Sequence, residues 1–163
     1  MFEWITVSQT LKLAAMIVPV AGIALAASQG HQAAPGTAGA EEAGVRVALN
    51  AYLEGHATGQ AEAFRRAFYS EARMLYARDG HFVKTEIADF IARAPGKPAE
   101  DEAQRKRTID LIDIVGDAAI AKLTLVYPDV TFTDYMTLLK IDGEWRIVSK
   151  VFHADRKTPA PKS

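Results

Sequence analysis

The sequence predicts one α+β domain in which helices come first and an antiparallel β-meander follows. Between residues 45 and 94, apolar residues recur mainly at three- and four-residue spacing, which is the period of amphipathic helices. After residue 106, four segments rich in Ile, Val, Leu, Thr and Tyr are separated by turn-forming pairs, which indicates strands. A chain of 163 residues suits a single core, with the helices covering one face of a twisted sheet.

Composition and motifs exclude several classes of function. The formal net charge of -1, with acidic and basic residues interspersed, gives no field that attracts nucleic acid or anionic lipid. The chain has no cysteine, which removes disulfides and thiolate metal sites. The sequence also contains no Gly-rich phosphate loop, no serine nucleophile elbow and no HExxH motif. We therefore expect no metal and no cofactor.

The N-terminal segment predicts export. Lys12 precedes an uncharged apolar run over residues 13–27, and Ala24-Leu25-Ala26 has the pattern of a signal-peptide cleavage site. The run is shorter than the roughly 20 residues that a spanning helix needs, so we expect residues 1–27 to be a signal peptide. The protein is then periplasmic or secreted, with no membrane contact after removal of the signal. The alternative is an uncleaved N-terminal membrane anchor.

The segments on either side of the domain are expected to lack structure. Residues 28–43 are rich in Gly, Ala and polar residues without periodicity, which is typical of a flexible linker. Residues 154–163 are expected to form a disordered tail. The folded domain is therefore predicted over residues 44–153.

Three helices and one hairpin are expected in the first half of the domain. The first helix has an apolar stripe of Val45, Ala48, Leu49, Tyr52, Leu53 and His56. A second short helix follows at residues 61–68, and Asp79-Gly80 is a strong signal for a hairpin turn. The third helix is predicted over residues 85–94, with Thr85 as the N-cap and Pro95-Gly96 as the stop.

The second half is expected to form strands over residues 107–115, 118–127, 130–141 and 144–152. A two-residue turn at Asp142-Gly143 sets the register of the last two strands. The predicted facing pairs, which share the buried face with Trp145, are Phe132 with His153, Asp134 with Val151, Met136 with Ser149, and Leu138 with Ile147. The same reasoning places Leu123 beside Asp134, and Asp110 beside Leu123.

Several stretches of the domain resemble a known family. They are ALNAYLEGHATG (48–59), AEAFRRAF (61–68), EARMLYARDG (71–80), KPAEDEAQRKRTI (97–109) and YPDVTFTDYMTLLKIDGEWRIVSKVF (127–152). The chain resembles the nuclear-transport-factor-2-like superfamily, in its putative lumazine-binding branch, close to the polyketide-cyclase-like members. Relatives often have His-Pro after the Phe of the second helix, whereas here Tyr69-Ser70 follows Phe68.

The resemblance implies a cone-shaped α+β roll of the cystatin-like type. In this fold three N-terminal helices pack on a strongly curved antiparallel sheet. A pocket lies at the open end, and the outer face of the sheet commonly forms a homodimer.

Asp134 and His153 are the candidate catalytic residues. A carboxylate on an apolar face has its charged form disfavoured and can act as a general base, and His153 lies diagonally from it in the predicted register. The structural alternative is that Asp134 only accepts hydrogen bonds from Tyr52, Tyr76 or an arginine, and that His153 is exposed near the chain end. The candidate ligand-binding residues are Tyr52, His56, Tyr76, Asp110, Leu123, Phe132, Met136, Trp145 and Ser149.

Three functions fit this pattern. The first is an exported domain that binds a small apolar or aromatic molecule, forms a homodimer through its sheet and needs no cofactor. The second is a cofactor-free isomerase, cyclase or dehydratase in which Asp134 or His153 moves a proton beside a carbonyl group. The third is a non-catalytic protein-interaction module. The basic triplet Arg105, Lys106 and Arg107 is either a partner for an acidic ligand or a solvated strand entrance.

Overall fold

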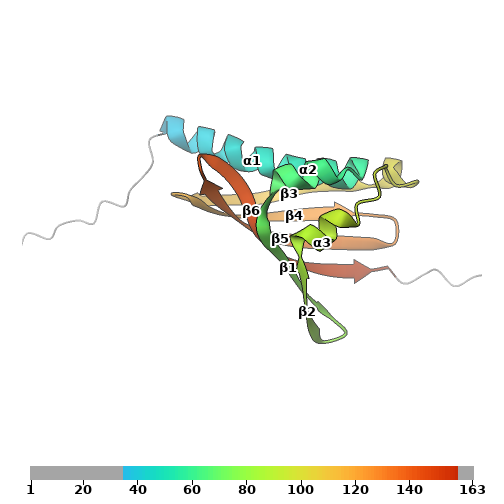
Figure 1. Ribbon diagram of the computed structural model, residues 1–163. Helices are drawn as coiled ribbons and strands as arrows, with labels where there is room; N and C mark the ends of the chain where they lie inside the picture. Colours follow the sequence, from blue (N-terminus) through green and yellow to red (C-terminus); the bar gives the residue numbers. More distant parts are fainter. Residues whose placement is uncertain (1–34, 158–163) are drawn as a thin grey trace, which may run out of the picture. The chain divides into compact units, whose positions relative to one another are not determined.

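The computed structural model describes residues 35–157, which form a curved six-stranded sheet with its helices on one face (Figure 1). The helices are α1 (Pro35–Thr58), α2 (Ala61–Ala67) and α3 (Ile87–Ala92), with a 3-10 turn at Glu102–Gln104. The strands are β1 (Phe68–Arg78), β2 (His81–Glu86), β3 (Lys106–Val115), β4 (Ala118–Val126), β5 (Val130–Ile141) and β6 (Glu144–Arg156). The α+β class is confirmed. Two helices precede the sheet, and α3 lies between β2 and β3.

The sheet has the strand order β2-β1-β6-β5-β4-β3. Strands β3 to β6 form the expected antiparallel meander, but β1 pairs with β6 in parallel, so the expected all-antiparallel sheet is wrong at one pairing. The reason is that β6 ends the meander with a free edge, and β1 occupies that edge and satisfies its backbone groups. The β1–β2 hairpin then extends the sheet away from α1 (Figure 1).

The first helix is longer than the sequence pattern predicts. It begins at Pro35, inside the segment expected to be a linker, and proline is well tolerated in a first helical turn. Glu41 accepts hydrogen bonds from Lys140 Nζ at 2.7 Å and from Trp145 Nε1 at 2.9 Å, which ties this early part of the helix to the β5–β6 hairpin. The predicted signal peptide over residues 1–27 and residues 28–34 of the predicted linker lie outside the described residues.

The end of the domain also differs from the expected boundaries. Strand β6 continues to Arg156, so three residues assigned to the disordered tail belong to the sheet. Residues 158–163 of that tail lie outside the described residues.

The turns and the helical stripe agree with the sequence. Asp142 and Gly143 have φ values of 52° and 84°, as in the predicted two-residue turn, and Ile141 faces Glu144. Val45, Leu49 and Tyr52, which lie on one face of α1, are fully buried. The third helix is shorter than predicted, and Glu86 rather than Thr85 is its N-cap residue.

Two irregularities change which side chains face the interior. Leu138 faces Ile147 as predicted, but Thr137 faces Ser149, so Val148 is an extra residue in β6. From this bulge onward, every side chain of β6 lies on the opposite face from the one predicted. Asp110 is the corresponding extra residue in β3, between the pairs Ile109–Leu123 and Leu111–Lys122.

Gly59, just after the end of α1, lets the backbone of the loop after α3 pack closely against it. Gly59 has a φ of 70°, and a Cβ atom there would lie 2.2 Å from the carbonyl oxygen of Lys97. Gly96 N donates to Gly59 O at 2.8 Å, and Gln60 Nε2 donates to Gly96 O. The loop over residues 93–97 is therefore held against the C-terminal end of α1, where it forms one wall of a hollow described below.

Candidate functional site

Three polar side chains from three different elements meet inside the apolar core. Asp134 on β5 is fully buried, and its Oδ2 accepts a hydrogen bond from the Tyr52 hydroxyl of α1 at 2.6 Å. Lys150 Nζ on β6 lies 2.9 Å from the same oxygen and donates to the Tyr52 hydroxyl at 2.5 Å. Asp134 Oδ1 is buried without a hydrogen-bond partner among the described residues. The expectation that Asp134 faces the interior is confirmed, and so is its contact with Tyr52.

Burial sets the protonation chemistry of this cluster. The pKa of Tyr52 is raised well above its ordinary value, first by burial and then by the negative charge of Asp134, so its hydroxyl remains a donor. Burial lowers the pKa of Lys150, and Asp134 partly opposes that shift. The ammonium also lies 4.8 Å from the ring centre of Phe152 and 4.9 Å from that of Tyr52, where cation–π attraction compensates part of its lost hydration.

Lys150 is the member of this buried cluster that sequence reasoning missed. A strict two-residue alternation from Trp145 and Ile147 predicts that Ser149 and Val151 face inward, whereas the bulge at Val148 turns Lys150 inward instead. A signal was available in the strand: apolar residues occupy odd positions up to Ile147, but the aromatic residue near the end is Phe152, at an even position. Such a change of phase within a strand indicates a bulge.

The same geometry contradicts three of the predicted site positions. His153 pairs with Thr133 rather than Phe132 and is exposed on the outer face of the sheet, so the Asp134–His153 acid-base pair is wrong. Ser149 also lies on the outer face, in a hollow with Tyr135. Asp110 is exposed at its bulge, where it accepts hydrogen bonds from the hydroxyls of Thr108 and Thr124.

The predicted apolar residues surround the cluster on its sheet side. Leu123 on β4 is the register partner of Asp134 on β5 and is fully buried, and Met136 is also buried. Phe132 is half-buried near Phe152, whose ring lies 4.6 Å from that of Tyr76. Tyr76 therefore takes part in an aromatic stack at the β1–β6 boundary and does not contact Asp134 through a hydrogen bond among those described.

His56 links the buried cluster to an open hollow. Its ring packs edge-on against Tyr52, with ring centres 4.6 Å apart, and against Phe64 at 5.2 Å. On its other side His56 lines a hollow of about 290 Å³ between the ends of α1 and α2, α3 and the loop after it. The other lining residues are Gly55, Gly59, Phe64, Phe90, Arg93, Ala94, Pro95, Lys97, Ala99 and Arg105.

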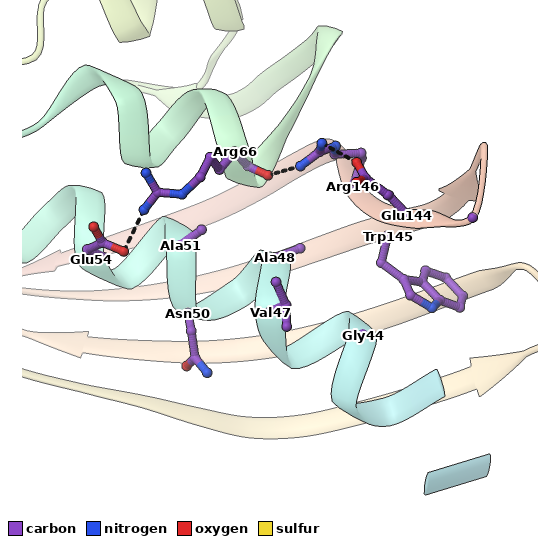
Figure 2. Close-up of a pocket in the computed structure, with 11 residues that line it drawn as sticks. Gly44, Val47, Ala48, Asn50, Ala51, Glu54, Arg66, Glu144, Trp145 and Arg146 are labelled. Atoms are coloured by element: carbon purple, nitrogen blue, oxygen red, sulfur yellow. Dashed lines mark hydrogen bonds and ion pairs between the residues drawn. The ribbon is translucent and has the colours of Figure 1, made fainter. Parts of the chain in front are cut away.

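Trp145 lies in a different hollow from His56. A groove of about 610 Å³ runs beside α1, where Gly44 allows the indole of Trp145 to lie against the helix (Figure 2). The charged groups of this groove already pair with one another: Arg66 with Glu54 at 2.7 Å, and Arg146 with Glu144. By contrast, Arg93 and Lys97 of the hollow at His56 form no ion pair among the described residues.

Comparisons with known proteins agree with this architecture. The model of the putative lumazine-binding family matches residues 40–153. The chain belongs to this family, within the NTF2-like superfamily. The resemblance inferred from the sequence is therefore confirmed, and together with the fold it supports a small-molecule-binding domain.

Two solved structures and one named relative are similar to this chain. An NTF2-like protein of unknown function from Shewanella baltica is 29% identical, with a TM-score of 0.65 over 72% of this chain and 96% of that one. One from Methylobacillus flagellatus is also 29% identical, with a TM-score of 0.62 over 71% and 93% of the two chains. Aldolase FrzH from Cladobotryum is 29% identical over 63% of this chain and 82% of its own length. None of the described helices has the length and apolar character needed to cross a membrane.

We predict that Lys150→Met lowers the free energy of unfolding by about 3 kcal/mol, because it leaves the Asp134 carboxylate buried without its cation. Combining it with Asp134→Asn restores part of that loss, since the double variant has no buried charge at the site. Urea denaturation of the two single variants and the double variant measures this coupling.

Lys84→Met is the matched control for that cycle. Lys84 pairs with Glu86 at 2.9 Å, and both side chains are about half exposed. Removing such a surface pair changes stability by less than about 1 kcal/mol. Equal effects of Lys84→Met and Lys150→Met would contradict the buried ion pair.

Proposed function

We propose that the domain binds a small molecule in the hollow lined by His56, Phe64 and Phe90. The observation that carries this proposal is the contact of His56 with both the hollow and the buried Tyr52–Asp134–Lys150 cluster. Small-molecule sites commonly combine apolar and aromatic walls with a few convergent polar groups, and this hollow has both. Its walls are also held in place, because the loop over residues 93–97 is hydrogen-bonded to the end of α1.

Native mass spectrometry of the protein purified from its own host tests this proposal. We expect a retained ligand in the unmodified protein and its loss in Ala94→Phe, because a larger side chain fills the hollow that Ala94 lines. Ala77→Phe is the matched control, since Ala77 is exposed on β1 and outside the hollow. A ligand that survives Ala94→Phe would place the binding site elsewhere.

A second candidate is a cofactor-free enzyme that acts on carbonyl compounds by aldol, isomerase, cyclase or dehydratase chemistry. Two observations favour it: the similarity to a protein named as an aldolase, and a buried lysine beside a carboxylate and a tyrosine hydroxyl. A lysine whose pKa is lowered by burial is the type of amine that adds to carbonyl groups or transfers a proton. In this scheme Lys150 and Asp134 act on the substrate. Neither side chain lines the hollow, so the scheme requires a movement of Tyr52, which contacts both His56 and the two charged groups.

Acetone and 4-nitrobenzaldehyde provide a test of aldol chemistry with defined probes. The enzyme proposal predicts that the purified protein forms their aldol product and that Lys150→Met and Asp134→Asn each abolish this activity. His153→Ala should leave the rate unchanged, since His153 is exposed on the outer face. If Lys150→Met retains the rate of the unmodified protein, then Lys150 is not the reacting group.

We also propose that the protein forms a homodimer through the outer face of its sheet. Leu111, Ile120, Tyr135 and Val151 are 48%, 50%, 55% and 47% exposed, and they line a common apolar hollow on that face. Exposed apolar patches commonly bind another protein surface, and this supports the proposed dimer. A heterologous protein partner on the same patch is the alternative that corresponds to an interaction module.

Light scattering coupled to size-exclusion chromatography tests the dimer. We expect Tyr135→Glu to shift the protein from dimer to monomer, because dimerisation would bury an unpaired carboxylate, and its loss of hydration destabilises the interface. Val115→Glu should remain dimeric, since Val115 is exposed at the end of β3 and does not line the patch. A monomeric unmodified protein would favour the interaction module instead.

Export through removal of residues 1–27 is also part of the proposal, and it rests on the apolar run and the Ala24-Leu25-Ala26 pattern. The mature domain then acts in the periplasm or outside the cell without a membrane anchor. N-terminal sequencing of the protein recovered from its host should find a start near Ser28, whereas an intact Met1 in a membrane fraction would indicate an anchor.

A further inference from the structure

The hollow at His56 carries more information about its ligand than size alone. Two of the residues that line it, His56 and Arg105, each have a buried nitrogen atom, His56 Nε2 and Arg105 Nε, without a hydrogen-bond partner among the described residues. Buried polar groups in proteins are nearly always paired, so these two atoms indicate the kind of group that belongs beside them. The chemistry of both atoms determines whether that group is a donor or an acceptor.

Contacts of His56 Nδ1 favour one tautomer of the ring. Arg107 Nε donates to the Tyr127 hydroxyl at 3.3 Å, and this hydroxyl lies 3.4 Å from His56 Nδ1. Because the hydroxyl accepts from Arg107, it can donate its own proton to Nδ1, which leaves the histidine proton on Nε2. Burial, together with the charges of Lys150, Arg107 and Arg105, holds the pKa of His56 well below its ordinary value, so the ring stays neutral. In this tautomer His56 Nε2 is a donor.

Arg105 Nε is a donor as well, since a guanidinium has no acceptor. Its guanidinium is held over the Tyr127 ring, 4.2 Å from the ring centre, and one terminal nitrogen pairs with Asp101 at 2.8 Å. These contacts hold the side chain in place. Arg105 Nε is therefore a fixed donor, and with His56 in the favoured tautomer both unpartnered atoms require an acceptor.

The wall of the hollow is positively charged, which also favours an acceptor that carries negative charge. Among the described residues that line the hollow, Arg93, Lys97 and Arg105 are cationic and none is acidic. The remaining wall is aromatic, with the rings of Phe64 and Phe90 at a centre-to-centre distance of 4.9 Å. An acceptor with negative charge on a flat apolar body matches both halves of this surface.

On the basis of the proposed ligand-binding function, we infer that the hollow binds an aromatic carboxylate. Its carboxylate accepts hydrogen bonds from His56 Nε2 and Arg105 Nε, and its ring packs against Phe64 and Phe90. The volume of about 290 Å³ suits a molecule with one ring. The inference also gives a role to Arg105 in the basic triplet, because its Nε is free while one of its terminal nitrogens pairs with Asp101. In Arg107 both terminal nitrogens bond Glu102, at 2.6 and 2.8 Å, and Nε bonds the Tyr127 hydroxyl.

Benzoate and its neutral isostere benzamide are the probes for this inference. Titration of the purified protein, followed by amide chemical shifts, should show benzoate binding about tenfold more tightly than benzamide, because charge-assisted hydrogen bonds are stronger than neutral ones. Arg105→Gln should remove most of this preference. Arg46→Gln is the matched control and should leave it unchanged, since Arg46 pairs with Glu42 on an exposed face of α1, ten positions before His56.

The possible results distinguish the proposed binding site in the hollow from the inference that its ligand is an aromatic carboxylate. If benzoate and benzamide bind with equal affinity at the residues of the hollow, the carboxylate inference is wrong and the binding site stands. If the ligand found by mass spectrometry is lost in Ala94→Phe and is a cation, the carboxylate inference is also wrong. If neither probe shifts these residues and no ligand is retained, both proposals fail. The comparison of the two probes in the unmodified protein does not depend on how Arg105→Gln folds.

Discussion

The buried ion pair between Asp134 and Lys150 is the interaction on which the rest of the interior depends. Two charges inside an apolar core are tolerated only when they lie close together and share hydrogen bonds, and the Tyr52 hydroxyl supplies those bonds from α1. The helix and the two central strands of the sheet must therefore keep one relative position. Such a constraint favours a unique arrangement of α1 over the sheet, beyond what apolar packing of Leu49 and Leu123 alone would select.

The sequence predicts the elements of this domain better than the details of its site. Helical spacing and the Asp-Gly turns give the class, the burial of Tyr52 and Asp134, and the pairing of Ile141 with Glu144, because these features follow from local periodicity. The inward position of Lys150 and the outward position of His153 depend on one extra residue, Val148. A bulge of this kind is decided by packing between strands and helices rather than by local preference, so simple alternation cannot place it.

The hollow at His56 could not be predicted from the sequence either, because it also depends on packing between distant segments. It is formed by the ends of three helices and by a loop that is brought close by Gly59, whose positive φ and contact with Lys97 have no periodic signature. The sequence did single out His56 and Arg105, but only the fold shows that they share one wall. The site then combines a rigid rim, fixed donors and aromatic walls with a charged cluster behind Tyr52, and this combination fits a family of small-molecule-binding domains.

A crystal structure of the purified protein is the most direct test of this account. We expect the carboxylate of Asp134 within hydrogen-bond distance of both the Tyr52 hydroxyl and the ammonium of Lys150, with Val148 as the extra residue of β6. Density that placed Ser149 and Val151 in the interior and Lys150 in solvent would contradict the account, because the cluster and its link to the hollow would no longer exist.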